Sequence, residues 1–198
     1  MNYATIILAA GQSSRLGRAK QLLIWQGKSF VEHTFDLAST VVSEKQIIIV
    51  TGGRKELVEE HLIEKGLPFI HNPNWEEGMG SSIRVGVNHL LQAVPNIDGI
   101  LIMVCDQVKI QSTDLQNLLN AHQANQDKVI AAQYLGRVGV PAVFPQTWFS
   151  VLSTLEGDRG ARFLLRKRPD EVISIDLPNA AFDVDTEEDY RELLGLIS

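Results

Sequence analysis

Short apolar segments alternate with longer segments of helical periodicity along the sequence, and this alternation restricts the fold more than any other feature. The apolar segments are residues 5–9, 46–50, 68–71, 100–104, 129–132, 142–144 and 172–175. The helical segments are residues 29–42, 54–65, 81–91, 112–125, 146–155, 160–168 and 186–196. Strands that alternate with helices over short connections are typical of a three-layer α/β/α sandwich with a mostly parallel sheet. We therefore predict this α/β fold, with ligands bound at the carboxyl ends of the strands.

Length and composition exclude several other classes of protein. A chain of 198 residues without a linker or repeat is expected to form one domain over residues 1–198. Eighteen basic residues against 24 acidic ones give a net charge of −6, which argues against nucleic acid as a partner. The longest apolar run, residues 100–105, is too short to span a membrane. The single cysteine, Cys105, cannot form an internal disulfide, so we expect a soluble protein of the reducing cytoplasm.

The segment after the first predicted strand is rich in small residues and cations. Backbone amides of small residues in a turn bind anions, arginine binds phosphate oxygens bidentately, and lysine adds a mobile charge. Leu16 stands where a P-loop needs glycine, and Ser13 and Leu16 stand where the dinucleotide-binding motif needs glycines. The residues expected to bind a polyphosphate are Leu8, Ala9, Ala10, Gly11, Arg15 and Lys20. The alternative interpretation is an ordinary surface loop with solvated basic side chains.

Two acidic positions are candidate metal ligands. Asp106 follows the apolar strand at residues 100–104, and a carboxylate at that strand end, beside a bound polyphosphate, suits Mg²⁺. Asp185 is the second candidate, and Asp183 lies on the same face if this stretch is extended. The alternatives are a solvated turn for Asp106 and a helix N-cap for Asp185.

Two further segments have glycine, serine or arginine residues at the start of a predicted helix. Ser81, Ser82 and Arg84 follow a glycine-containing turn and are candidates to contact the nucleotide, the alternative being a capped turn. Residues 157–162 form another cationic, glycine-flanked helix start, which either holds the phosphate of an acceptor or simply caps a helix.

These segments together resemble the molybdenum cofactor cytidylyltransferases and their relatives, the MobA-like NTP transferases. The resemblance rests on residues 8–20, 78–86, 106–107, 139–144, 157–162 and 183–186, which follow one another in the family's order. It implies a Rossmann-like nucleotidyltransferase fold of the GT-A type, and the catalytic residues that it implies are Arg15, Lys20 and Asp106. It further implies that Asp106 and Asp185 hold the metal. Val108 replaces a proline that is common in the family, and Cys105 replaces a small residue.

The resemblance also suggests a donor and an acceptor. The cytidylyl branch has Ala-Ala-Gly at residues 9–11, as this chain does, whereas the guanylyl branch has Ala-Gly-Gly, so Ala10 favours CTP. We expect a Mg²⁺-dependent transfer of CMP to the phosphate of molybdopterin, with release of pyrophosphate and delivery of the product to a molybdenum enzyme. The alternatives are GTP as donor, another small phosphorylated acceptor, or a non-catalytic protein that binds and delivers the cofactor. The missing glycines argue against an ordinary Rossmann oxidoreductase.

Overall fold

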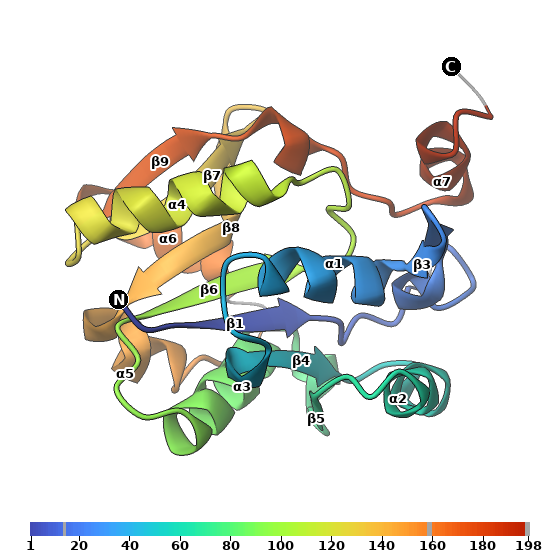
Figure 1. Cartoon of the computed structure of the whole chain (residues 1–198), viewed down its shortest axis with the longest axis horizontal. Coiled ribbons are helices and arrows are strands. Elements are labelled where there is room, and N and C mark those ends of the chain that lie inside the picture. The colour runs from blue at the N-terminus through green and yellow to red at the C-terminus, as the bar shows by residue number, and fades with distance from the viewer. Residues whose placement is uncertain (14, 158–159, 197–198) are drawn as a thin grey trace.

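The computed structural model describes residues 1–13, 15–157 and 160–196, and within these ranges seven strands form the main sheet (Figure 1). In chain order they are β1 (Tyr3–Leu8), β4 (Ile47–Thr51), β5 (Phe69–His71), β6 (Gly99–Val104), β7 (Val129–Tyr134), β8 (Arg137–Pro145) and β9 (Val172–Asp176). Their spatial order is β5-β4-β1-β6-β8-β7-β9. Only β8 runs antiparallel to its neighbours among these strands, so the predicted, mostly parallel α/β fold is confirmed.

Helices cover both faces of the sheet. The helices are α1 (Phe30–Ser39), α2 (Lys55–Glu64), α3 (Met79–Ala93), α4 (Ser112–Ala124), α5 (Phe149–Leu152), α6 (Ala161–Lys167) and α7 (Glu187–Leu193). Figure 1 shows α1 and α4 on one face, where they bury one apolar cluster with alternate strand residues such as Ile7 and Leu101. The intervening residues, such as Ile6 and Ile100, face the second cluster with α3, α5 and α6. None of the helices in the described part of the chain has the length and apolarity needed to cross a membrane.

The order of the strands creates a crevice at the carboxyl end of the sheet. From β1 the chain passes to β4 and β5 on one side and then returns to place β6 on the other side of β1. Leu8 pairs with Val104, so the segments that follow β1 and β6 leave the sheet side by side. Such a reversal of strand order is where open α/β sheets bind their ligands.

Local signals in the sequence set the ends of two helices. Ser29 and Glu32 form a capping box at the start of α1, and Thr186 and Asp189 form another at α7, each from a hydroxyl residue followed three positions later by an acidic one. A small hairpin, β2 (Ile24–Trp25) with β3 (Lys28–Ser29), was not expected from periodicity because each strand has two residues. Its turn is formed by Gln26 and Gly27, which both have positive φ angles, as a type I′ turn requires.

Helix α3 lies unusually close to the sheet at Gly86. A Cβ atom on this residue would lie 3.0 Å from Cγ2 of Ile6 and 3.0 Å from Cγ2 of Val50. Both neighbours are fully buried strand residues, so neither has room to move aside. Gly86 therefore sets the distance between α3 and the strands, and with it the position of the loop that begins α3.

We predict that Gly86→Val lowers the free energy of unfolding by about 1–3 kcal/mol, because it overfills a packed core. Chemical denaturation with urea measures the change. Gln92→Val, at an exposed position of the same helix, is the matched control for placing a β-branched residue on α3 outside the core. Equal stability of the two variants would contradict the packing argument.

Candidate active site

Two pockets meet at Asp106 on the carboxyl edge of the sheet. The first has a volume of about 320 Å³ and is lined by residues of the loop after β1, by Lys20 and by the turn that begins α3. The second, of about 520 Å³, lies toward β8 and α6. Met79, Val104 and Asp106 line both pockets. A group bound in one pocket therefore reaches a group bound in the other at the Asp106 carboxylate.

A buried glutamine fixes the loop after β1. Gln21 is 1% exposed, and its Nε2 atom donates to the carbonyl oxygens of Ala9 (2.8 Å) and Gly11 (2.7 Å). These two bonds turn the carbonyl groups of the loop inward. Leu8, Ala9, Ala10, Gly11 and Lys20, all predicted to bind nucleotide, line the first pocket together. No pattern in the sequence indicates the role of Gln21, because a glutamine beside a cationic loop is typical of a surface position.

Two glycines after β4 support the same loop from behind. A Cβ atom on Gly53 would lie 2.9 Å from Cα of Gln12, and one on Gly52 would lie 2.5 Å from Cβ of Trp75. The amide of Gly53 also donates to the carbonyl oxygen of Ala10 at 2.9 Å. In the sequence these glycines lie between the predicted strand at residues 46–50 and the predicted helix at residues 54–65, which is the place of an ordinary strand–helix turn. The structure shows that they allow the backbone of the loop to approach the end of β4.

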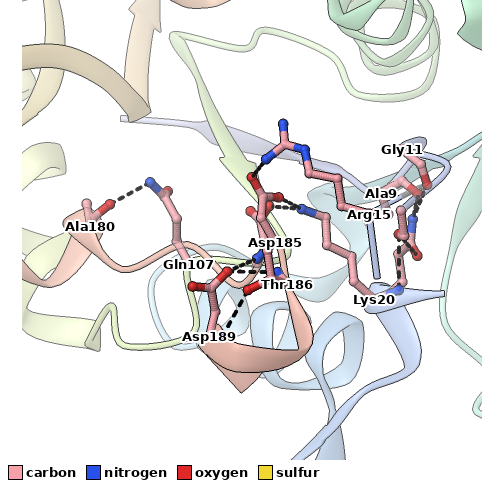
Figure 2. A network of polar contacts seen from close by, with 12 residues as sticks. Ala9, Gly11, Arg15, Lys20, Gln107, Ala180, Asp185, Thr186 and Asp189 are labelled. Carbon is pink, nitrogen blue, oxygen red and sulfur yellow. Dashed lines mark hydrogen bonds and ion pairs between the residues drawn. The ribbon is translucent and has the colours of Figure 1, made fainter. Parts of the chain in front are cut away.

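Two cations and two carboxylates form a compact cluster (Figure 2), of which Lys20 and Asp106 line the first pocket. The Nζ atom of Lys20 lies 2.5 Å from Oδ2 of Asp106 and 2.8 Å from Oδ1 of Asp185. Arg15 donates to the other oxygen of Asp185 at 3.0 Å. The Lys20 and Asp106 side chains are each 16% exposed, whereas that of Arg15 is 73% exposed. The fold thus brings together the four charged residues that the sequence singled out.

The charges of the cluster shift the pKa values of its side chains and of their neighbours. Burial alone would lower the pKa of Lys20, but attraction to Asp106 and hydrogen bonds to both carboxylates outweigh it and raise that pKa. The hydrogen bond from Lys20 lowers the pKa of Asp185. Partial burial, followed by repulsion from Asp106 and Asp185, raises the pKa of Asp183 to about 6. Burial raises the pKa of the Cys105 thiol to about 12, so this thiol stays protonated and unreactive.

The backbone of Asp185 is held by the start of α7. The Asp189 carboxylate accepts from the amides of Asp185 (2.9 Å) and Thr186 (2.7 Å). Val184, the residue between Asp183 and Asp185 in the sequence, is fully buried. Asp183 lines the second pocket, whereas Asp185 contacts Lys20 and Arg15. Asp189 is a positioning residue that the sequence revealed only as a helix cap.

The donor atoms around Asp106 suit a divalent cation. Its Oδ1 atom is buried and has no hydrogen-bond partner among the residues that the structure describes. The same residues contain no cluster of three or more histidine, cysteine or acidic side chains arranged to hold a metal. Mg²⁺ is commonly bound by one or two carboxylates, with substrate phosphates and water as the other ligands. The pair of Asp106 and Asp185 fits that pattern.

The residues predicted at the start of α3 are divided among different environments. Ser82 lines the first pocket and accepts a hydrogen bond from Asn72 at 3.0 Å. Ser81 is fully buried, outside that lining, and its hydroxyl donates to the carbonyl oxygens of Asn74 and Gly78. Arg84 binds Glu77 and the carbonyl oxygen of Leu155 beside a separate cavity. Ser81 and Arg84 therefore shape the turn, and the structure does not bring them to the first pocket.

The second pocket contains part of the predicted acceptor segment. Gly160, Ala161 and Arg162 line it, whereas Asp158 and Arg159 lie outside the described residues. Gly139 and Val140, at the start of the motif in residues 139–144, contribute to the opposite wall. Val108, which departs from the family pattern, is buried in a third apolar cluster and does not line the pocket.

We predict that Gln21→Leu lowers the free energy of unfolding by about 1–3 kcal/mol, because two inward carbonyl groups lose their donor. Gln116→Leu, at an exposed site on α4 where the amide donates to the side chain of Asn120, is the control. Urea denaturation of both variants measures the difference. If Gln21→Leu were as stable as the control variant, the loop would not depend on these hydrogen bonds.

Comparison with known proteins agrees with this geometry. Residues 5–172 match the family described as MobA-like NTP transferase domain. The chain is 32% identical to nicotine blue oxidoreductase of Paenarthrobacter nicotinovorans over 96% of this chain and 95% of that protein. It is 36% identical to the molybdenum cofactor cytidylyltransferase of Escherichia coli over 41% of this chain and 42% of that enzyme.

A solved structure is similar over the full length of the chain. Rv0371c of Mycobacterium tuberculosis, in a complex with manganese, superimposes with a TM-score of 0.78 at 26% identity, and the match covers 100% of both chains. The family match, the sheet with its crevice between β1 and β6, and the paired pockets agree with the resemblance seen in the sequence. The chain belongs to the MobA-like NTP transferases, a family of nucleotidyltransferases.

Proposed function

We propose that this protein transfers a nucleotidyl group from a nucleoside triphosphate, CTP in the first instance, to the phosphate of a molybdopterin-type acceptor. The observation that carries the proposal is the junction of two pockets at Asp106. The triphosphate would bind in the first pocket, against the loop after β1, and the acceptor in the second. A transferase needs two such adjoining sites, because the reacting atoms must meet in line.

The residues of the cluster supply position and charge. The acceptor phosphate, already ionised, attacks the α-phosphorus and pyrophosphate leaves, so no side chain has to remove a proton. Arg15 and Lys20 would neutralise the departing pyrophosphate, and the loop amides near Gly11 would orient the phosphates. Asp106 and Asp185 would hold Mg²⁺, which neutralises the charge that develops on the α-phosphate. Arg162, on the wall of the second pocket, would face the acceptor.

CTP is proposed as the donor because of Ala10. This residue lines the first pocket, and its Cβ lies 2.8 Å from the place of a Cβ on Gly52. The cytidylyltransferase among the relatives supports the same donor, whereas other relatives are named as probable molybdenum cofactor guanylyltransferases. GTP is therefore the competing donor. We also propose that the protein is soluble and cytoplasmic and that it passes its product to a molybdenum enzyme.

A second candidate function rests on a relative that matches most of the chain. That relative is named as an oxidoreductase, and the match covers 96% of the present chain. An oxidoreductase built on this framework would bind a redox cofactor in the crevice, where we place a nucleotide. Calorimetric titration with CTP, GTP, ATP and UTP, each with Mg²⁺, and with NADH and NADPH separates the candidates. Binding of a nicotinamide cofactor without binding of any triphosphate would favour the second.

We predict that Asp106→Asn lowers the rate of pyrophosphate release from CTP and molybdopterin by about a hundredfold or more, because a charge that acts on the transition state is lost. A coupled pyrophosphate assay measures the rate, and calorimetry shows whether CTP still binds. Asp36→Asn is the matched control, since Asp36 is an exposed carboxylate paired with Lys28 away from the pockets. Undiminished turnover by Asp106→Asn would refute the assigned role.

A further inference from the structure

The Lys20 ammonium group occupies the space between the two carboxylates proposed to hold the metal. It contacts Oδ2 of Asp106 and Oδ1 of Asp185, at 2.5 and 2.8 Å. Arg15 takes Oδ2 of Asp185. Three of the four carboxylate oxygens of this pair therefore already have a cationic partner, and only Oδ1 of Asp106 has none among the described residues.

The charges of the cluster balance without any ligand. Asp106 and Asp185 contribute two negative charges, and Lys20 and Arg15 contribute two positive ones. A divalent cation bound by both carboxylates would lie within a few ångströms of the Lys20 ammonium group. At that distance, in a partly buried site, like charges repel strongly because little water screens them. The metal and Lys20 thus compete for the same oxygens.

A triphosphate offers Lys20 and Arg15 new partners. Its oxygens can accept charge-assisted hydrogen bonds from both side chains, since Lys20 lines the first pocket and Arg15 shares the Asp185 carboxylate with Lys20. Lys20 has four methylene groups and can redirect its ammonium group without movement of the backbone. Once Lys20 turns to the phosphates, both carboxylates become free to bind a cation.

We propose that Lys20 is a built-in counter-ion that keeps the metal site closed until a nucleotide arrives, so that metal and nucleotide bind with positive cooperativity. This inference rests on the proposed function, because it takes the ligand to be a metal–triphosphate complex. It adds that neither component alone binds well: the metal must displace Lys20, and the phosphates must draw Lys20 and Arg15 away from carboxylates. By thermodynamic reciprocity, each ligand raises the affinity for the other by the same factor.

Binding of Mn²⁺ without nucleotide tests the first half of the proposal. Free Mn²⁺ gives an electron paramagnetic resonance signal that is lost on binding, so titration yields its affinity with no catalytic turnover. We expect Lys20→Met to bind Mn²⁺ about tenfold more tightly than the unmodified protein, within the usual range of coupling between sites. Lys28→Met, which removes an exposed lysine paired with Asp36, is the matched control and should leave the affinity unchanged.

Binding of CTP without metal tests the second half. Asp185→Asn releases Arg15 and one contact of Lys20, so it should raise the affinity for metal-free CTP several-fold, measured by calorimetry in the presence of EDTA. Glu187→Gln is the control, because Glu187 forms an exposed ion pair with Arg18 near the same loop. The cooperativity between Mn²⁺ and CTP should be weaker in Lys20→Met than in the unmodified protein, because the part of it that comes from displacement of Lys20 is lost while direct binding of the metal to the phosphates remains.

The outcomes separate this inference from the proposed function. Equal Mn²⁺ affinities of the unmodified protein and Lys20→Met would overturn the counter-ion role, even if pyrophosphate were released normally. Tighter Mn²⁺ binding by the variant would support it, even if CTP proved not to be the donor. Circular dichroism checks that Lys20→Met is folded, and Lys20→Gln takes its place if it is not, with the same expected direction.

Discussion

The rest of the site depends on the pairing of β1 with β6 at the point where the order of strands reverses. Leu8 and Val104 are partners across this pair, so Ala9 and Cys105 begin two loops that leave the sheet together. Asp106 consequently lies beside the loop that carries Arg15 and Lys20, although 86 residues separate Lys20 from Asp106 in the sequence. The site follows from the topology of the sheet, and the side chains then determine its chemistry.

The cationic loop lies in an acidic protein because its charges are balanced locally. Arg15 and Lys20 face carboxylates of the cluster, and the neighbouring Arg18 pairs with Glu187 at the start of α7. The C-terminal segment thus supplies carboxylates to the N-terminal loop. Figure 1 shows that α7 lies next to β3, although the two elements are far apart in the sequence.

Much of this arrangement could be predicted from the sequence. Apolar runs such as that ending at Val104 marked the strands, and the position of Asp106 directly after one of them marked the carboxyl edge. The sequence did not reveal Gln21, because its importance lies in two backbone carbonyl groups that only the fold brings near its side chain. Serines and an arginine after a glycine turn have the same pattern whether they face a ligand or brace the turn. Ser81 and Arg84 brace it, as their burial and hydrogen bonds show.

Residues 52–53 illustrate a second limit of sequence reasoning. Their missing side chains matter because Trp75 and Gln12, distant in sequence, approach within the space that a Cβ would need. No local pattern encodes such an approach, since it arises only when three segments converge. The same holds for Asp189, whose capping pattern was visible but whose bond to the amide of Asp185 depends on the course of the chain before α7.

The shared wall at Asp106 also bears on how the protein can be inhibited. Because the two pockets open onto one carboxylate, a single molecule can place one end in each and carry an unreactive linkage between them. Once one end of such a molecule is bound, the other end binds its pocket intramolecularly, at a high effective concentration. The joined molecule therefore binds far more tightly than either half alone. The same geometry makes selectivity achievable, since the half that faces Arg162 and Val140 contacts the wall formed by β8 and α6, away from the loop after β1.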